Sequence, residues 1–150
     1  MDSFTHIKVK SHSAIDNIYY HKESNSIFVG DVFDKSWHPV FYSGGIKGFN
    51  EAIDAILNLC DEQSLIIPGH GVPSSKLSLL EFRKNTFEWV NKIRELLKKG
   101  VGVGEIMIDT QVKDILGKFN VKNKSPFLPQ KAYRSFIERN ISVINDEKSL

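Results

Sequence analysis

The chain has 150 residues, of which 41% are hydrophobic and 25% charged, with a formal net charge of +2 at pH 7. These values are typical of one soluble globular domain with a core of its own. The basic residues form no long run and no apolar stretch reaches 18 residues, so neither nucleic acid nor a membrane is an expected partner. The single cysteine, Cys60, excludes an internal disulfide and a zinc site built on cysteines. The first ten residues lack the apolar stretch of a signal peptide, which favours a cytoplasmic location.

The first third of the chain is predicted to be rich in β-structure. Residues 6–10 alternate between polar and apolar side chains, as a short strand does. Two β-prone runs, residues 17–24 and residues 27–31, meet at the turn sequence ESNS and predict a β-hairpin. The apolar run at residues 27–29, and a second one at residues 65–67, are each predicted to be buried on both faces.

A helix is predicted between these two buried runs. A glycine-rich loop, residues 41–48, leads into a helical pattern over residues 49–59. Glu51 and Asp54 fall early in this pattern, where the helix dipole favours acids. The middle of the chain therefore reads as strand, helix, strand.

The last half of the chain is predicted to be helical. The clearest helix covers residues 76–98, with Ser74 or Ser75 as its N-cap. Weaker helical patterns follow over residues 103–118 and residues 131–144, separated by the polar segment NVKNKSPFLPQ. The order of β-rich, βαβ and α-rich segments predicts a mixed α+β fold.

Both buried runs end in a glycine followed by a side chain that can bind a metal. Gly30 precedes Asp31, and Gly69 precedes His70, while His12 lies in the loop after the first short strand. Strand exits of this kind meet at one edge of a sheet, so the three polar side chains are expected to share one site. Taken singly, each residue also fits a solvated loop or a turn. The specific signal is that two buried runs each end in a glycine and a possible ligand, with a predicted helix between them.

The segments HSAIDNIYYHKESNSIFVGD and LIIPGHG resemble the C-terminal half of the metallo-β-lactamase-fold hydrolases, in the family's order and at family-like distances. The resemblance implies that residues 1–100 form half of an αββα sandwich and that residues 101–150 form a helical extension of the same domain. It also implies ligand roles for a pair of zinc ions. His12 matches a histidine on the first ion, Asp31 matches the bridging carboxylate, and His70 matches a histidine on the second ion.

The sequence departs from the family at its principal ligand motif. No His-x-His-x-Asp-His is present, and that motif supplies four of the seven usual protein ligands. The zinc site implied by the resemblance is therefore partial, and weak metal binding is expected. Ile15 stands where the family usually has a glycine, which alters the loop beside His12. Trp37 and His38 stand where the family often has a pocket-rim loop, and they either contact substrate or turn the chain.

Three functional hypotheses follow. The first is a truncated or partial metallo-β-lactamase-fold hydrolase, whose parent fold hydrolyses an ester, thioester, lactone or similar bond. Such a chain is inactive alone, or active with a separate N-terminal half-domain. The second is a non-catalytic interaction module that forms a homodimer or binds a partner through an exposed sheet face. The third is a complete enzyme with an unusual mononuclear metal site.

Overall fold

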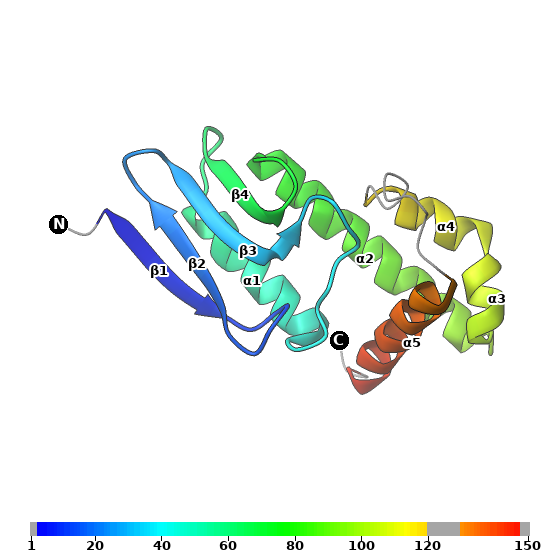
Figure 1. Cartoon of the computed structure of the whole chain (residues 1–150). Helices are drawn as coiled ribbons and strands as arrows, with labels where there is room; N and C mark the ends of the chain where they lie inside the picture. The colour runs from blue at the N-terminus through cyan, green and yellow to red at the C-terminus, as the bar shows by residue number, and fades with distance from the viewer. Residues whose placement is uncertain (1–2, 120–129, 148–150) are drawn as a thin grey trace.

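A computed structural model describes residues 3–119 and residues 130–147. Four strands form one mixed sheet in sequence order (Figure 1): β1 (Phe4–Val9), β2 (Asp16–His21), β3 (Ser26–Asp34) and β4 (Leu65–His70). The first three strands are antiparallel, and the predicted hairpin is β2–β3. The chain then crosses through α1 (Gly45–Leu59), so that β4 pairs in parallel with β3. The predicted mixed α+β fold is confirmed.

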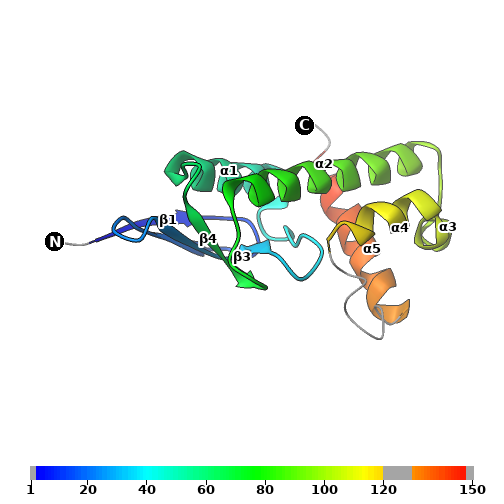
Figure 2. The same cartoon turned by 90° about the horizontal axis from the view of Figure 1, so that it is seen from above.

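The helices lie on one side of the sheet (Figure 2). α1 and α2 (Lys76–Lys98) run side by side across one face. α2 continues past the end of the sheet, where three further helices gather round it: α3 (Val103–Ile108), α4 (Thr110–Gly117) and α5 (Gln130–Asp146). One continuous cluster of buried apolar side chains joins the sheet to these helices. The division of the chain at residue 100 stays a prediction.

The two faces of the sheet differ sharply in exposure. Ile18, Ile27 and Ile66 face α1 and α2 and are fully buried. On the opposite face Phe28 is 42% exposed and Leu65 is 43% exposed. The prediction that the runs containing these residues are buried on both faces is therefore wrong, because the helices cover one side only. The strand register places ten side chains on the uncovered side, which we call the open face: Phe4, His6, Lys8, Asn17, Tyr19, His21, Ser26, Phe28, Leu65 and Ile67.

α1 begins four residues earlier than the sequence predicts. The glycines expected in a loop lie in and beside its first turn, because the backbone after β1 passes directly over them. A Cβ atom added to Gly44 would lie 2.1 Å from the carbonyl oxygen of Lys10, and one added to Gly48 would lie 2.3 Å from it. The acids expected in the first turn accordingly lie further along the helix. These glycines are required by close packing rather than by a flexible loop.

The helix predicted over residues 76–98 is α2, and Ser75 is its N-cap, accepting a hydrogen bond from Ser78 N at 3.2 Å. The single helix predicted over residues 103–118 is instead two helices. Asp109 ends α3 and caps α4, since its Oδ1 accepts a hydrogen bond from Val112 N at 2.9 Å. A side chain that caps a new helix outcompetes continuation of the old one.

α5 contains the helix predicted over residues 131–144. The predicted polar linker falls at residues 120–129, outside the described residues. Within the described ranges, no helix combines the length and the apolar character needed to cross a membrane.

Candidate functional site

The three residues expected to share a site lie together at one end of the sheet. β1, β3 and β4 run in the same direction, so their carboxyl ends meet at this end. His12 follows β1, Asp31 lies in β3, and His70 is the last residue of β4. Asp31 Oδ1 is 3.3 Å from His70 Nε2, and Asp31 Oδ2 is 4.0 Å from His12 Nε2. The carboxylate therefore lies between the two imidazoles.

The His12 loop is held by a residue that the sequence reasoning missed. Asp16, the first residue of β2, accepts hydrogen bonds from Ser11 N at 2.9 Å and from Ser13 N at 3.1 Å. It also accepts one from the Ser13 hydroxyl at 2.7 Å. A single carboxylate thus binds the backbone on both sides of His12, and it fixes where that ring leaves the chain. An aspartate that follows two serines within five residues is the local signal, since such side chains often bond nearby backbone amides.

Two glycines shape the position of Asp31. Gly30 adopts φ +54°, a backbone conformation that other residues rarely take, at an irregularity in the β3–β4 pairing. A Cβ atom on Gly69 would lie 2.1 Å from Asp31 Oδ1 and 2.7 Å from the backbone carbon of Gly30. Gly69 therefore gives the carboxylate room to lie against β4. The repeated glycine-then-ligand pattern has a different physical cause in each strand.

The side chains present fit only part of a metal site. Two donors on one tetrahedral zinc ion lie about 3.3 to 3.4 Å apart, and the Asp31–His70 pair matches that separation. His12 faces the other carboxylate oxygen at a longer distance, so each imidazole has its own oxygen, as a bridging carboxylate requires. Among the described residues, no group of three or more His, Cys, Asp and Glu side chains is placed to hold a metal ion. The zinc site stays a prediction.

The structure separates Trp37 and His38 from these three residues. His38 is 5% exposed, and its ring stacks on Phe136 of α5 with a centroid distance of 3.7 Å. The Trp37 ring lies 4.8 Å from the His38 ring and packs against the core. The His38 ring thus connects the segment after β3 to α5, and a substrate contact by His38 stays a prediction. A substrate contact by Trp37 stays a prediction.

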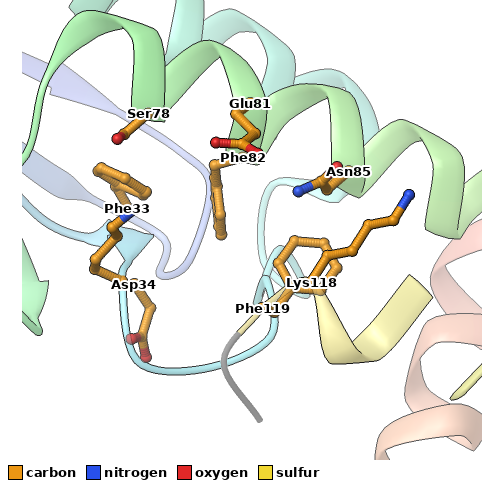
Figure 3. Close-up of a pocket in the computed structure, with 9 residues that line it drawn as sticks. Phe33, Asp34, Ser78, Glu81, Phe82, Asn85, Lys118 and Phe119 are labelled. Carbon is orange, nitrogen blue, oxygen red and sulfur yellow. The ribbon is translucent and has the colours of Figure 1, made fainter. Parts of the chain in front are cut away.

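A small pocket of about 160 Å³ adjoins the end of β3 (Figure 3). It lies between the end of β3, α2 and the segment after α4. Asp34 pairs with His70 in the sheet register, and Lys35 N donates a hydrogen bond to the His70 carbonyl oxygen at 3.0 Å. The pocket is therefore anchored to the same strand end as His70. No local signal predicts this pocket, because its walls come from segments far apart in the chain.

No protein-family model matches this chain, and no curated protein matches its sequence. Its structure is similar to that of the stereoselective inverting sec-alkylsulfatase Pisa1 from Pseudomonas sp., with a TM-score of 0.57 and 14% identity over 99% of this chain. A double mutant of that sulfatase gives the same TM-score over the same share of this chain, at 15% identity. The described residues are thus structurally similar to part of a metallo-β-lactamase-fold protein.

The likeness covers 26% of the sulfatase chain, so this chain spans about a quarter of the length of the structures it matches. Identity at this level shows a shared fold and leaves the reaction open. The expectation of a metallo-β-lactamase-type fold is confirmed in that sense.

Proposed function

We propose that this chain is one half of a metallo-β-lactamase-fold hydrolase, and that its metal-dependent chemistry needs donors from a second half. The observation that carries the proposal is the placement of the Asp31 carboxylate between His12 and His70, with a different oxygen toward each ring. The reaction class is hydrolysis of an ester, thioester, lactone or similar bond. By itself the chain is inactive.

The partial donor set supports the need for a second half. A catalytic zinc site generally has three protein ligands on one ion, and the described residues offer a shared carboxylate with one imidazole on each side. The side chains of these three residues are also open to solvent, at 35% for His12, 39% for Asp31 and 64% for His70. Hydrolytic metal sites rely on a shaped cavity that excludes bulk water. Further chain packed against this end of the sheet would supply both donors and enclosure.

In this proposal the chain contributes residues that position the metal ligands. Asp16 holds the loop that presents His12, and Gly69 lets Asp31 approach β4. A bound zinc ion would supply an activated water and polarise the bond to be cleaved. The residues named here would orient such an ion from one side.

A zinc titration followed by calorimetry tests this proposal. The native chain is expected to bind at most one ion per chain, weakly, and Asp31→Asn is expected to abolish that binding because it removes the shared carboxylate. His6→Ala is the matched control, since His6 lies on the open face and bonds Asn17 instead. Two tightly held ions per chain, or binding that survives Asp31→Asn, would contradict the proposal.

The open face supports a second candidate function, a non-catalytic interaction module that forms a homodimer. Its aromatic side chains already pack on one another: the His6 ring stacks on Tyr19 at 4.6 Å, and the Phe4 ring lies 4.7 Å from the His21 ring. Four strands of about six residues present roughly 400 Å² on one side, and polar residues such as Lys8 and Asn17 share this area with the apolar ones.

A second copy of this chain is the occupant we propose for the open face. Two such faces packed together would bury roughly 800 Å² in total, below the range of stable complexes, so the dimer is expected to be weak and concentration-dependent. The same patch on both copies is the geometry of an isologous twofold interface. The two candidates differ in what they predict for the isolated chain: metal dependence in the first, and self-association in the second.

A further inference from the structure

The two edges of the sheet are built differently (Figure 1). At the β4 edge the chain itself pairs with the strand: Ile66 N donates to the Ser74 carbonyl oxygen at 2.8 Å, and Ser74 N donates to the Ile66 carbonyl oxygen at 2.7 Å. At the opposite edge, β1 pairs with β2 on one side, and none of the described residues pairs with its other side. One edge is therefore protected by a segment of the chain, and the other is free.

The free edge of β1 presents its backbone groups at every second residue. Lys22 N donates a hydrogen bond to the Ser3 carbonyl oxygen at 3.0 Å, so these two residues form a hydrogen-bonded pair just before the strand. Along antiparallel strands, such pairs alternate with pairs that are not hydrogen-bonded. The N–H and C=O groups of Phe4, His6 and Lys8 therefore point away from β2. An extended chain with the spacing of a β-strand matches these three positions.

An apolar trough lies beside this edge, between β1 and α1. Its volume is about 510 Å³, and its walls include Ile7 and Val9 of β1, Ile15 of the following loop and Ala55 of α1. Ile15 is 61% exposed, so this wall is open to a binding partner. A strand added at the free edge would place every second side chain toward the trough, because side chains alternate between the two faces of a sheet. Those side chains are expected to be apolar.

The charges beside the free edge favour an acidic partner. Lys8 and Lys10 line the trough and are exposed, and neither forms an ion pair with any described residue. Glu51 is the acid in the lining, and its carboxylate lies 3.8 Å from Lys47 Nζ. β1 contains no acidic residue, so a second copy paired along this edge would bring lysines together. An acidic segment is therefore a better match than a second copy.

We propose that the free edge of β1 binds an extended acidic segment of a partner protein, which adds a fifth strand to the sheet. Backbone hydrogen bonds to Phe4, His6 and Lys8 hold the segment, and its apolar side chains fill the trough. Its acidic side chains, on the other face, lie beside Lys8. The inference rests on neither candidate function, because pairing at this edge needs no metal and leaves the open face uncovered.

Amide hydrogen exchange of the full chain, followed by NMR, tests the proposal. The probe is a peptide of about six residues, the usual strand length, in which valine and glutamate alternate and both ends are blocked. In the free chain, the amides of His6 and Lys8 should exchange fast and those of Ile7 and Val9 slowly, because only the latter bond β2. Saturating peptide should slow exchange at His6 and Lys8 at least about tenfold.

Two outcomes of this measurement would overturn the proposal. The first is protection that stays absent at millimolar peptide, or that falls on other strands instead. The second is slow exchange at His6 and Lys8 in the free chain that becomes fast on dilution, since this would show that a second copy occupies the edge.

Modified peptides separate edge pairing from nonspecific binding. Two of them carry N-methyl groups on one or the other set of alternate amides. Only one set can face β1, so one methylated peptide should lose binding and the other should keep it. Equal binding of the two would refute pairing at the edge.

A charge reversal tests the choice of an acidic partner. A peptide with lysine in place of glutamate should bind the native chain at least about threefold more weakly, because it meets Lys8 and Lys10. Lys8→Glu should reverse that preference. Lys113→Glu, at an exposed lysine on α4, makes the same change of charge away from the edge and should leave the preference as it is. An unchanged preference in Lys8→Glu would refute the proposed partner.

Discussion

The covered face and the open face of the sheet are built from alternate residues of the same strands, yet they have opposite environments. On the covered face, Ile27 and Val29 are fully buried beneath the helices. Between them in sequence, Phe28 points the other way and is 42% exposed. Alternation along a strand thus gives neighbouring apolar residues opposite environments when helices cover one face only.

The open face is also more aromatic than the covered one. The covered face uses mainly branched aliphatic side chains, with Tyr20 beside them, and they pack against the helices. The open face carries Phe4, Tyr19 and Phe28 together with two histidines, a composition typical of interfaces, where rings with a polar edge are favoured. The homodimer proposal accounts for this difference, since it assigns one face to permanent burial and the other to association.

The largest expected effect comes from changing adjacent residues on the two faces. Ile27→Ala should lower the free energy of unfolding by about 2 to 4 kcal/mol, because it opens a cavity in a closed core. Phe28→Ala should lower it by less than about 1 kcal/mol in dilute solution, since much of that side chain is already in water. Urea unfolding measured by circular dichroism gives both values. Similar losses for the two variants would mean that the open face is covered in the monomer.

A smaller loss is expected at the loop that carries His12. Asp16→Ala removes the hydrogen bonds to Ser11 and Ser13, and should cost about 1 to 2 kcal/mol of stability because the loop amides lose their partner. The same variant should weaken any zinc binding through His12. Asp54→Ala is the matched control: its ion pair with Arg83 lies at the exposed surface, and its loss should cost less than about 1 kcal/mol. Equal effects would show that Asp16 does not order the loop.

The smallest effect concerns Cys60, which follows α1. Burial raises the pKa of its thiol from 9.0 to about 11. The folded state thus favours the neutral thiol, and the resulting stabilisation is complete below pH 9 and is lost as the pH rises toward 11. Between pH 9 and pH 10, native protein should lose more stability than the Cys60→Ser variant. Thermal melts at each pH measure the stability of both proteins. Equal losses of stability in the two would show that the thiol is not shielded.

Local signals in the sequence predicted much of the fold. The ESNS turn predicted the hairpin, and the polar residue before a periodic run predicted Ser75 as the cap of α2. The proximity of His12, Asp31 and His70 was also predictable, because parallel strands bring their ends together. The break between α3 and α4 was not predicted, because it depends on capping by the Asp109 side chain and the periodic pattern of apolar residues continues across it.

Features that depend on distant contacts were not predictable. The glycines before α1 resembled a loop, since nothing local shows that the backbone of Lys10 passes over them. His38 resembled a rim residue, and only the placement of α5 shows that it stacks on Phe136. Whether one or both faces of a sheet are covered likewise depends on distant segments. The apolar run at residues 27–29 fits either case, so it does not predict which one occurs.

Light scattering during size-exclusion chromatography tests most directly whether the open face is made for association. Between about 1 and 200 μM, the native chain is expected to shift from its monomer mass of 17.1 kDa toward twice that value. The double variant Tyr19→Lys with Phe28→Lys should stay monomeric throughout, because a dimer would bury four like charges, two from each copy. Leu77→Lys, an exposed apolar residue on α2, is the control and should dimerise as the native chain does. A native chain that remains monomeric over the whole range, with a cooperative melt, would contradict the account.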